Sequence, residues 1–214
     1  MDIFQTLGFA LPELLLAIGA MALLIVGLYA GERAYQLMSQ ASVALLAAAL
    51  ALTVFASGGG VQSLFDGAFR IDAFATFSKA IIVIAAAFAV VMSQRFEGGD
   101  EMKRFEYPVL IVLAAFGMAL MVSATDLISL YMGIETQSLA LYVLAAINRD
   151  SRRSTEAGLK YFVLGALSSC LLLYGASLVY GFSGATSFEA IAEAAKGDEP
   201  NTGLVIGLVF LRSG

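Results

Sequence analysis

Long apolar segments separated by short polar stretches restrict the fold of this sequence more than any other feature. Six segments approach or reach the roughly 20 residues that an α-helix needs to cross the ~30 Å hydrocarbon core of a bilayer. They comprise residues 9–30, 40–57, 72–93, 107–124, 127–147 and 157–182. None alternates polar and apolar residues as the strands of a membrane β-barrel do, so the segments predict helices.

A seventh apolar segment begins near Thr202 and reaches Leu211, just before the last three residues of the sequence. About ten residues are too few to cross a bilayer. We therefore predict an all-α, polytopic integral membrane protein with six complete transmembrane helices and a truncated seventh. Residues 1–214 are expected to form a single transmembrane helical domain, with no separate soluble domain.

The composition excludes several classes of protein. The chain is 60% apolar and 14% charged, whereas a soluble domain is roughly 45–50% apolar and about 25% charged. A net charge of −5 does not attract phosphate backbones, so no nucleic-acid partner is expected. With no histidine and one cysteine, Cys170, we expect neither an internal disulfide nor a metal or iron–sulfur site. Cys170 lies in an apolar run and is predicted to be a small core residue.

Basic residues are concentrated in alternate connections between the segments. Seven lie in the first, third and fifth connections, namely Arg33, Arg95, Lys103, Arg104, Arg149, Arg152 and Arg153. The opposite side has only Arg70 and Lys196 outside the apolar segments. Because positively charged loops remain in the cytoplasm, the N-terminus is predicted to face outward.

Two connections on the predicted outer side are more than turns. Three glycines at 58–60 open an irregular loop that continues to Arg70. Thr186 or Ser187 can cap a short helix whose apolar residues share one face. That helix is either an amphipathic segment at the membrane surface or an ordinary loop helix.

Glu135 is the strongest functional candidate. It lies nine residues beyond Asp126, about 13 Å along the helix axis and close to the bilayer midplane. Tyr131, Ser138 and Tyr142 share its helix face. A carboxylate at this depth is costly and usually faces protein or water on a transport path, where it can accept and release protons. The alternative is a protonated glutamate that serves only packing.

Lys160 is the second candidate. It lies four or five residues inside the sixth segment, about 7 Å from its cytoplasmic end. Lysine at this depth either acts within the membrane or extends its ammonium to the interface. Lys160 and Glu135 differ in height by ~10 Å, so we expect no direct salt bridge between them.

Two further charged residues fall within apolar segments. Lys79 lies about seven residues into the third segment, and Glu13 follows Pro12 near the outer end of the first. For both we expect an interfacial or helix-end role, since a helix N-terminus favours a negative charge such as that of Glu13.

The Glu135 and Lys160 segments carry a family resemblance. The stretches LISLYMGIETQSLALYVLAA (127–146) and STEAGLKYFVLGALSS (154–169) resemble the N subunit family of bacterial respiratory complex I, the proton-translocating NADH:quinone oxidoreductase. Leu-Pro-Glu at 11–13 and Asp-Ala-Phe at 72–74 agree with it. The paralogous L and M subunits and the related Mrp-type antiporters usually carry tryptophan before this glutamate. Here the residue is Ile134, which favours subunit N.

The resemblance implies the N-terminal part of a larger antiporter-like subunit in the bacterial inner (plasma) membrane. It implies proton transfer by Glu135, in exchange with a lysine on the seventh span, and supports Lys160 as an intramembrane base. In the family the seventh span is broken and continues into a Pro-Phe-His segment, which this sequence does not reach. The implied partners are lipid and other membrane-arm subunits. NADH, FMN, iron–sulfur clusters and quinone would belong to the wider complex and not to this chain.

Two alternatives remain open at this point. One is a subunit of an Mrp-type cation/proton antiporter, in which intramembrane glutamate and lysine residues would have the same role. The other is a structural fragment of the membrane arm that packs against its neighbours and conducts nothing.

Overall fold

The computed structural model describes residues 8–30, 35–56, 61–65, 67–94, 104–196 and 201–214. The glycines at 58–60 and three of the basic residues used to predict orientation, Arg33, Arg95 and Lys103, lie outside the described residues. The outward orientation of the N-terminus therefore stays a prediction.

Six helices in the described part of the chain are long and apolar enough to cross a membrane. They are α2 (Leu11–Ala30), α3 (Tyr35–Ala56), α4 (Ala73–Gln94), α5 (Glu106–Ser123), α6 (Leu127–Ala145) and α7 (Arg152–Ser183). The prediction of an all-α, polytopic membrane fold is confirmed. The seventh apolar segment forms the shorter helix α9 (Thr202–Ser213), which packs along α7.

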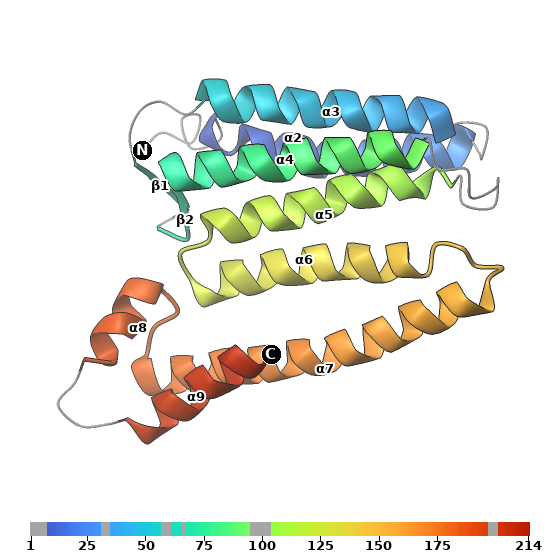
Figure 1. The fold of residues 1–214 in the computed structure, drawn as a ribbon. Coiled ribbons are helices and arrows are strands. Elements are labelled where there is room, and N and C mark those ends of the chain that lie inside the picture. Colours follow the sequence, from blue (N-terminus) through green and yellow to red (C-terminus); the bar gives the residue numbers. More distant parts are fainter. Residues whose placement is uncertain (1–7, 31–34, 57–60, 66, 95–103, 197–200) are drawn as a thin grey trace.

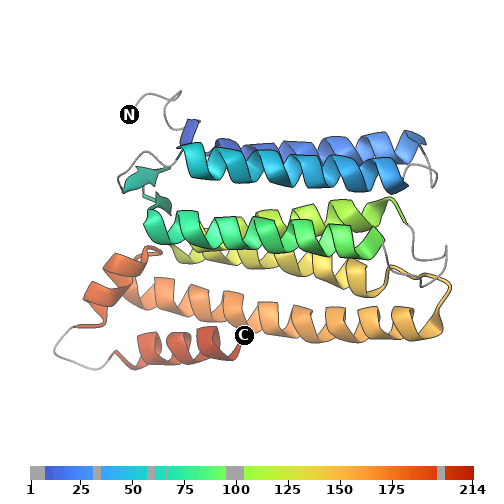
Figure 2. The same cartoon turned by 45° about the horizontal axis from the view of Figure 1, so that its top comes forward.

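The helices lie roughly side by side and form two groups (Figures 1 and 2). α2, α3, α4 and α5 surround a core that includes Leu16, Leu46, Val83 and Val112. α7 and α9 form the other group, and α6 lies between α5 and α7 (Figure 1). α6 therefore connects the N-terminal bundle to the C-terminal pair.

The close packing of α5 on α6 depends on two glycines. A Cβ atom at Gly117 of α5 would lie 2.5 Å from the backbone nitrogen of Gln137 on α6. A Cβ atom at Gly133 of α6 would lie 2.6 Å from Cγ of Met121 and 3.0 Å from the carbonyl oxygen of Gly117. Small residues allow helix backbones in lipid to approach this closely, and van der Waals packing then holds them together.

A small irregular region at one end of the bundle joins the two groups. It contains the antiparallel hairpin of β1 (Gln62–Leu64) and β2 (Phe69–Ile71) and the short helix α8 (Phe188–Ala194), which lie at the same end (Figure 1). The α5–α6 connection lies between them, because the Thr125 N–H donates to Ala68 and the Thr125 carbonyl accepts from Phe188. These bonds satisfy backbone groups that helix termini leave unpaired.

The short helix after the sixth span is confirmed, with Ser187 as its N-cap. Its Glu189 carboxylate lies 3.1 Å from the Arg70 guanidinium of β2, and both side chains are exposed. α8 therefore packs onto the same end of the bundle as the hairpin.

One prediction at the residue level was wrong, and one helix is longer than its apolar segment. The sixth helix begins at Arg152, five residues before the apolar segment 157–182, because Ser151 caps it and the polar turn 152–156 continues the helix beyond the apolar stretch. Cys170 is exposed on α7 and is not a core residue, because apolar residues surround a transmembrane helix on every side and hydropathy does not identify its packed face.

We predict that Gly133→Ala destabilises the packing of α6 on α5 by about 1–3 kcal/mol, the range for overpacking a close contact. Gly181→Ala on α7 is the matched control, because no atom of the described residues outside its own helix backbone and its two chain neighbours lies within 4 Å of its Cβ position. Thermal unfolding of the purified protein in mild detergent measures both variants. A Gly133→Ala variant as stable as the Gly181→Ala variant would contradict the steric role of Gly133.

Candidate functional site on helices α6 and α7

Asp126 fixes where α6 begins. Its Oδ1 accepts hydrogen bonds from the backbone nitrogens of Ile128 and Ser129, each at 2.8 Å. Its Oδ2 accepts from the Ser129 hydroxyl at 2.9 Å. This N-cap sets the register of the 19-residue helix, and Glu135, nine residues later, lies about 13 Å along the axis. The carboxylate is thus near the middle of a membrane-length helix.

Glu135 is partly buried against α7. Its Oε1 accepts a hydrogen bond from the hydroxyl of Ser169 on α7. The Ser169 oxygen also lies 3.0 Å from the Tyr131 hydroxyl. A serine hydroxyl has one proton to donate, so Tyr131 must be the donor when Ser169 donates to Glu135. The three side chains therefore form a directed chain of hydrogen bonds from Tyr131 through Ser169 to Glu135.

The remaining polar face of α6 also contacts α7. The Tyr142 ring packs edge-on against Tyr161, with centroids 4.8 Å apart, and against Phe162 at 5.7 Å. Its hydroxyl lies so close to Gly165 that no Cβ atom fits there. The prediction that this face points into the bundle is confirmed for Tyr131, Glu135 and Tyr142.

Lys160 lies apart from Glu135. Its Nζ donates to Oε1 of Glu156 at 2.6 Å, one turn earlier on α7, and its side chain is 70% exposed. Lys160 is nine residues from Ser169, or about 13 Å along the axis, which agrees with the predicted lack of a direct salt bridge. Because α7 begins at Arg152, Lys160 lies about 12 Å from the helix start, and its depth of ~7 Å from the end of the apolar segment stays a prediction.

The structure pairs the two other intramembrane charges. Lys79 of α4 forms a salt bridge with Glu13 of α2, and their side chains are only 5% and 13% exposed. Glu13 lies in the first turn of its helix, as expected. The Lys79 ammonium reaches this same first turn and is buried in the pair, and the interfacial or helix-end role of Lys79 stays a prediction. A lysine inside an apolar helix does predict that an oppositely charged partner lies nearby. The sequence gives no spacing by which to identify Glu13 as that partner, 66 residues away.

The sequence of this chain is similar to membrane proteins of the NADH:quinone oxidoreductase and Mrp antiporter group. The family model described as "NADH:quinone oxidoreductase/Mrp antiporter, TM" matches residues 124–214, which carry both Glu135 and Lys160. Subunit N 1 of NADH-quinone oxidoreductase from Rhizobium meliloti (strain 1021) is 52% identical over 99% of this chain. Subunit N from Maricaulis maris (strain MCS10) is 54% identical over 97% of it. The chain spans 44% and 43% of the lengths of these two relatives.

Solved structures give the same grouping. A chain of respiratory complex I from Thermus thermophilus with bound Aureothin superposes with a TM-score of 0.75 and 28% identity, over 95% of this chain and 42% of that one. A chain of the Mrp complex from Dietzia sp. DQ12-45-1b also gives a TM-score of 0.75, over 98% of this chain and 40% of that one. At 22% identity, the Mrp likeness shows a shared fold alone.

We predict that Ser169→Ala raises the frequency of the carboxylic C=O stretch of protonated Glu135, because the group loses a hydrogen-bond donor. Infrared difference spectra of the protein measure this band, and its loss in Glu135→Gln assigns it. Ser183→Ala is the control, since the Ser183 hydroxyl donates to backbone carbonyls at the C-terminal end of α7. A Glu135 band that does not move in Ser169→Ala would contradict the hydrogen-bonded chain.

Proposed function

We infer that this chain, which is homologous to NADH-quinone oxidoreductase subunit N over nearly its whole length, is a proton-translocating component of the membrane arm of respiratory complex I. The homology and the six apolar helices make it a multi-pass protein of the bacterial inner membrane. We further propose that residues 1–214 form one transmembrane helical domain of a longer antiporter-like subunit.

The observation that carries the proposal is the hydrogen-bonded chain that ends on Glu135. When a proton arrives on the Tyr131 oxygen, the hydroxyl proton of Tyr131 can pass to Ser169 and that of Ser169 to the Glu135 carboxylate. Each oxygen gains one proton and gives one up, except Glu135, which becomes neutral. Removing the charge also removes the cost of holding a carboxylate in a poorly solvated site.

We propose that Lys160 takes up protons at the entry to the transfer path or relays them along it. Its ammonium lies too far along α7 to contact Glu135 directly, so any transfer between them runs through water or another residue. Glu156 accepts from it at 2.6 Å, and this carboxylate can exchange protons with Lys160 at the same helix surface. The pair lies nearer the predicted cytoplasmic end of α7 than Glu135 does.

The relatives belong to multi-subunit membrane complexes, which supports a wider assembly for this chain. We propose that the partners of this chain are other membrane-arm subunits and the lipid bilayer. NADH, FMN, the iron–sulfur clusters and quinone would be bound by other subunits. The chain would then contribute to the oxidoreductase as a translocase component, with proton transfer as its own chemistry.

An Mrp-type cation/proton antiporter subunit is the second candidate, supported by the fold shared with the Dietzia Mrp complex. A non-conducting element of the membrane arm is the third. Sodium-dependent proton exchange by the purified protein, without co-purifying complex I subunits, would favour the antiporter.

We predict that Glu135→Gln lowers proton pumping coupled to quinone reduction by about tenfold or more, because glutamine cannot accept a proton. Inverted membrane vesicles that contain the full complex measure pumping, and co-purification of the subunits verifies assembly. Glu189→Gln is the control carboxylate, on exposed α8. Unchanged pumping in an assembled Glu135→Gln complex would refute the role of Glu135.

We predict that Lys160→Ala lowers pumping and quinone reductase activity together in an assembled complex. Lys160→Arg should restore only part of both, because a guanidinium does not release its proton at these pH values. A lysine that only extends its charge to the interface would be replaced fully by arginine. Full activity of Lys160→Arg would therefore refute the relay role, and Lys196→Ala, in the connection after α8, serves as the control.

A further inference from the structure

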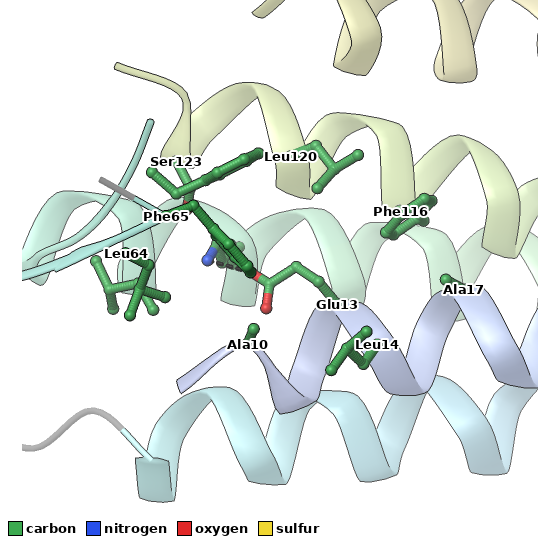
Figure 3. A pocket seen from close by; sticks show the side chains of 12 residues that line it. Ala10, Glu13, Leu14, Ala17, Leu64, Phe65, Phe116, Leu120 and Ser123 are labelled. Atoms are coloured by element: carbon green, nitrogen blue, oxygen red, sulfur yellow. Dashed lines mark hydrogen bonds and ion pairs between the residues drawn. The ribbon is translucent and has the colours of Figure 1, made fainter. Parts of the chain in front are cut away.

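The Glu13–Lys79 pair and the Glu135 site differ in whether water reaches their oxygens. Figure 3 shows the Glu13 carboxylate extending from α2 into a region of apolar side chains, and its Oε2 is buried without a hydrogen-bond partner in the described part of the chain. Glu135 is only partly buried, and its Oε2, which also has no partner among the described residues, retains accessible surface. A path that continues through water is therefore open at Glu135 and closed at Glu13.

The Tyr142 hydroxyl lies at a height between those of Lys160 and Glu135. A Cβ atom at Gly165 of α7 would overlap this hydroxyl, so the two groups are level with one another. Gly165 is five residues from Lys160 and four from Ser169, the residue that donates to Glu135. At 1.5 Å per residue, the hydroxyl divides the ~13 Å between Lys160 and the level of Glu135 into steps of ~7.5 and ~6 Å.

Packing against α7 holds the Tyr142 ring in this position. The ring lies edge-on against Tyr161 and Phe162, with centroids 4.8 and 5.7 Å away. Helical side chains lean toward the N-terminus of their helix, so Tyr142 extends from its own backbone toward Glu135, seven residues earlier. The absence of a Cβ at Gly165 provides the space that the hydroxyl occupies.

Ser138 lies between Glu135 and Tyr142 on the same face of α6. The hydroxyls of Ser138 and Tyr142 have no hydrogen-bond partner among the described residues, and neither is sealed from solvent as those of Ser39 and Ser42 are. Each hydroxyl can accept a proton on its oxygen and donate its own. Because two hydrogen bonds of about 2.8 Å span ~6 Å, Ser138 or one water can close the step from Tyr142 to the level of Glu135.

We propose that Tyr142 relays protons between Lys160 and Glu135, a role that rests on the proton-transfer function proposed above. The Lys160 ammonium gives a proton, through water, to the Tyr142 oxygen. The hydroxyl proton of Tyr142 then passes through Ser138 or water to the Glu135 carboxylate. Lys160 becomes a neutral amine and Glu135 a neutral acid, whereas Tyr142 and Ser138 end with the protons that they need to act again.

Tyr142→Phe tests the relay in the full complex, because it removes the hydroxyl and keeps the ring that packs against Tyr161 and Phe162. We expect pumping in inverted membrane vesicles to fall by about fivefold, below the 10²–10⁴ typical of a general acid or base, because water can partly replace the hydroxyl. The ratio of the pumping rates in light and heavy water should rise, since proton transfer then limits pumping. The Glu135 infrared band should keep its frequency, because Ser169 still donates to that carboxylate.

Tyr174→Phe is the matched control. It removes a tyrosine hydroxyl from α7, where the ring packs edge-on against Phe210, and it should leave both pumping and the isotope ratio unchanged. Gly165→Ala keeps Tyr142 but displaces its hydroxyl from α7. It should reproduce the effect of Tyr142→Phe, and it takes the place of that variant if Tyr142→Phe does not assemble.

Two results would overturn the relay. One is a Tyr142→Phe complex that pumps as fast as Tyr174→Phe, and the other is slower pumping with an unchanged isotope ratio, which indicates lost packing instead. Glu135→Gln in the same vesicles separates this proposal from the proposed function. If Glu135→Gln pumps normally, the role of Glu135 fails and the relay fails with it. If Glu135→Gln is impaired but Tyr142→Phe is not, the relay alone is wrong.

Discussion

The contact between Gly117 and Gly133 is the interaction on which the rest of the structure depends. In lipid, helices gain little free energy from burying apolar surface against one another, and they associate through close van der Waals packing instead. The absence of a Cβ on these two residues lets the backbones of α5 and α6 meet. α5 already packs against α2, α3 and α4, so this contact attaches α6, and with it Glu135, to a rigid bundle.

The two charged sites share one physical requirement. A carboxylate removed from water must recover its lost hydrogen bonds from the protein or from retained water. Glu135 recovers one from Ser169, whose own oxygen lies within hydrogen-bond distance of Tyr131. Glu13 recovers one from Lys79. In both sites the donor comes from another helix, so helix packing decides which hydrogen bonds each carboxylate receives.

The hairpin end shows how irregular backbone is accommodated next to membrane helices. The N–H of Leu127, the first residue of α6, donates to the carbonyl of Thr186 at 3.0 Å, and the Phe188 N–H, at the start of α8, donates to Thr125 at the same distance. Backbone groups of two connections thereby satisfy one another. The same bonds hold α8 and the start of α6 together, and so fix the end of α7 relative to the Glu135 helix.

The sequence alone determined the helices and the depth of Glu135. Both depend on local quantities: the length of each apolar stretch, the cap at Asp126 and the 1.5 Å rise per residue. It did not determine which side of a helix packs, since a transmembrane helix is apolar on all sides, and so Cys170 was predicted wrongly. Nor did the apolar stretch alone show that α7 begins at Arg152, because the turn 152–156 is polar. Only the tertiary structure decided the partners of the charges. The Glu13–Lys79 pair and the Ser169–Glu135 bond join residues 66 and 34 positions apart, and such contacts depend on how separate helices pack rather than on the periodicity of any one of them.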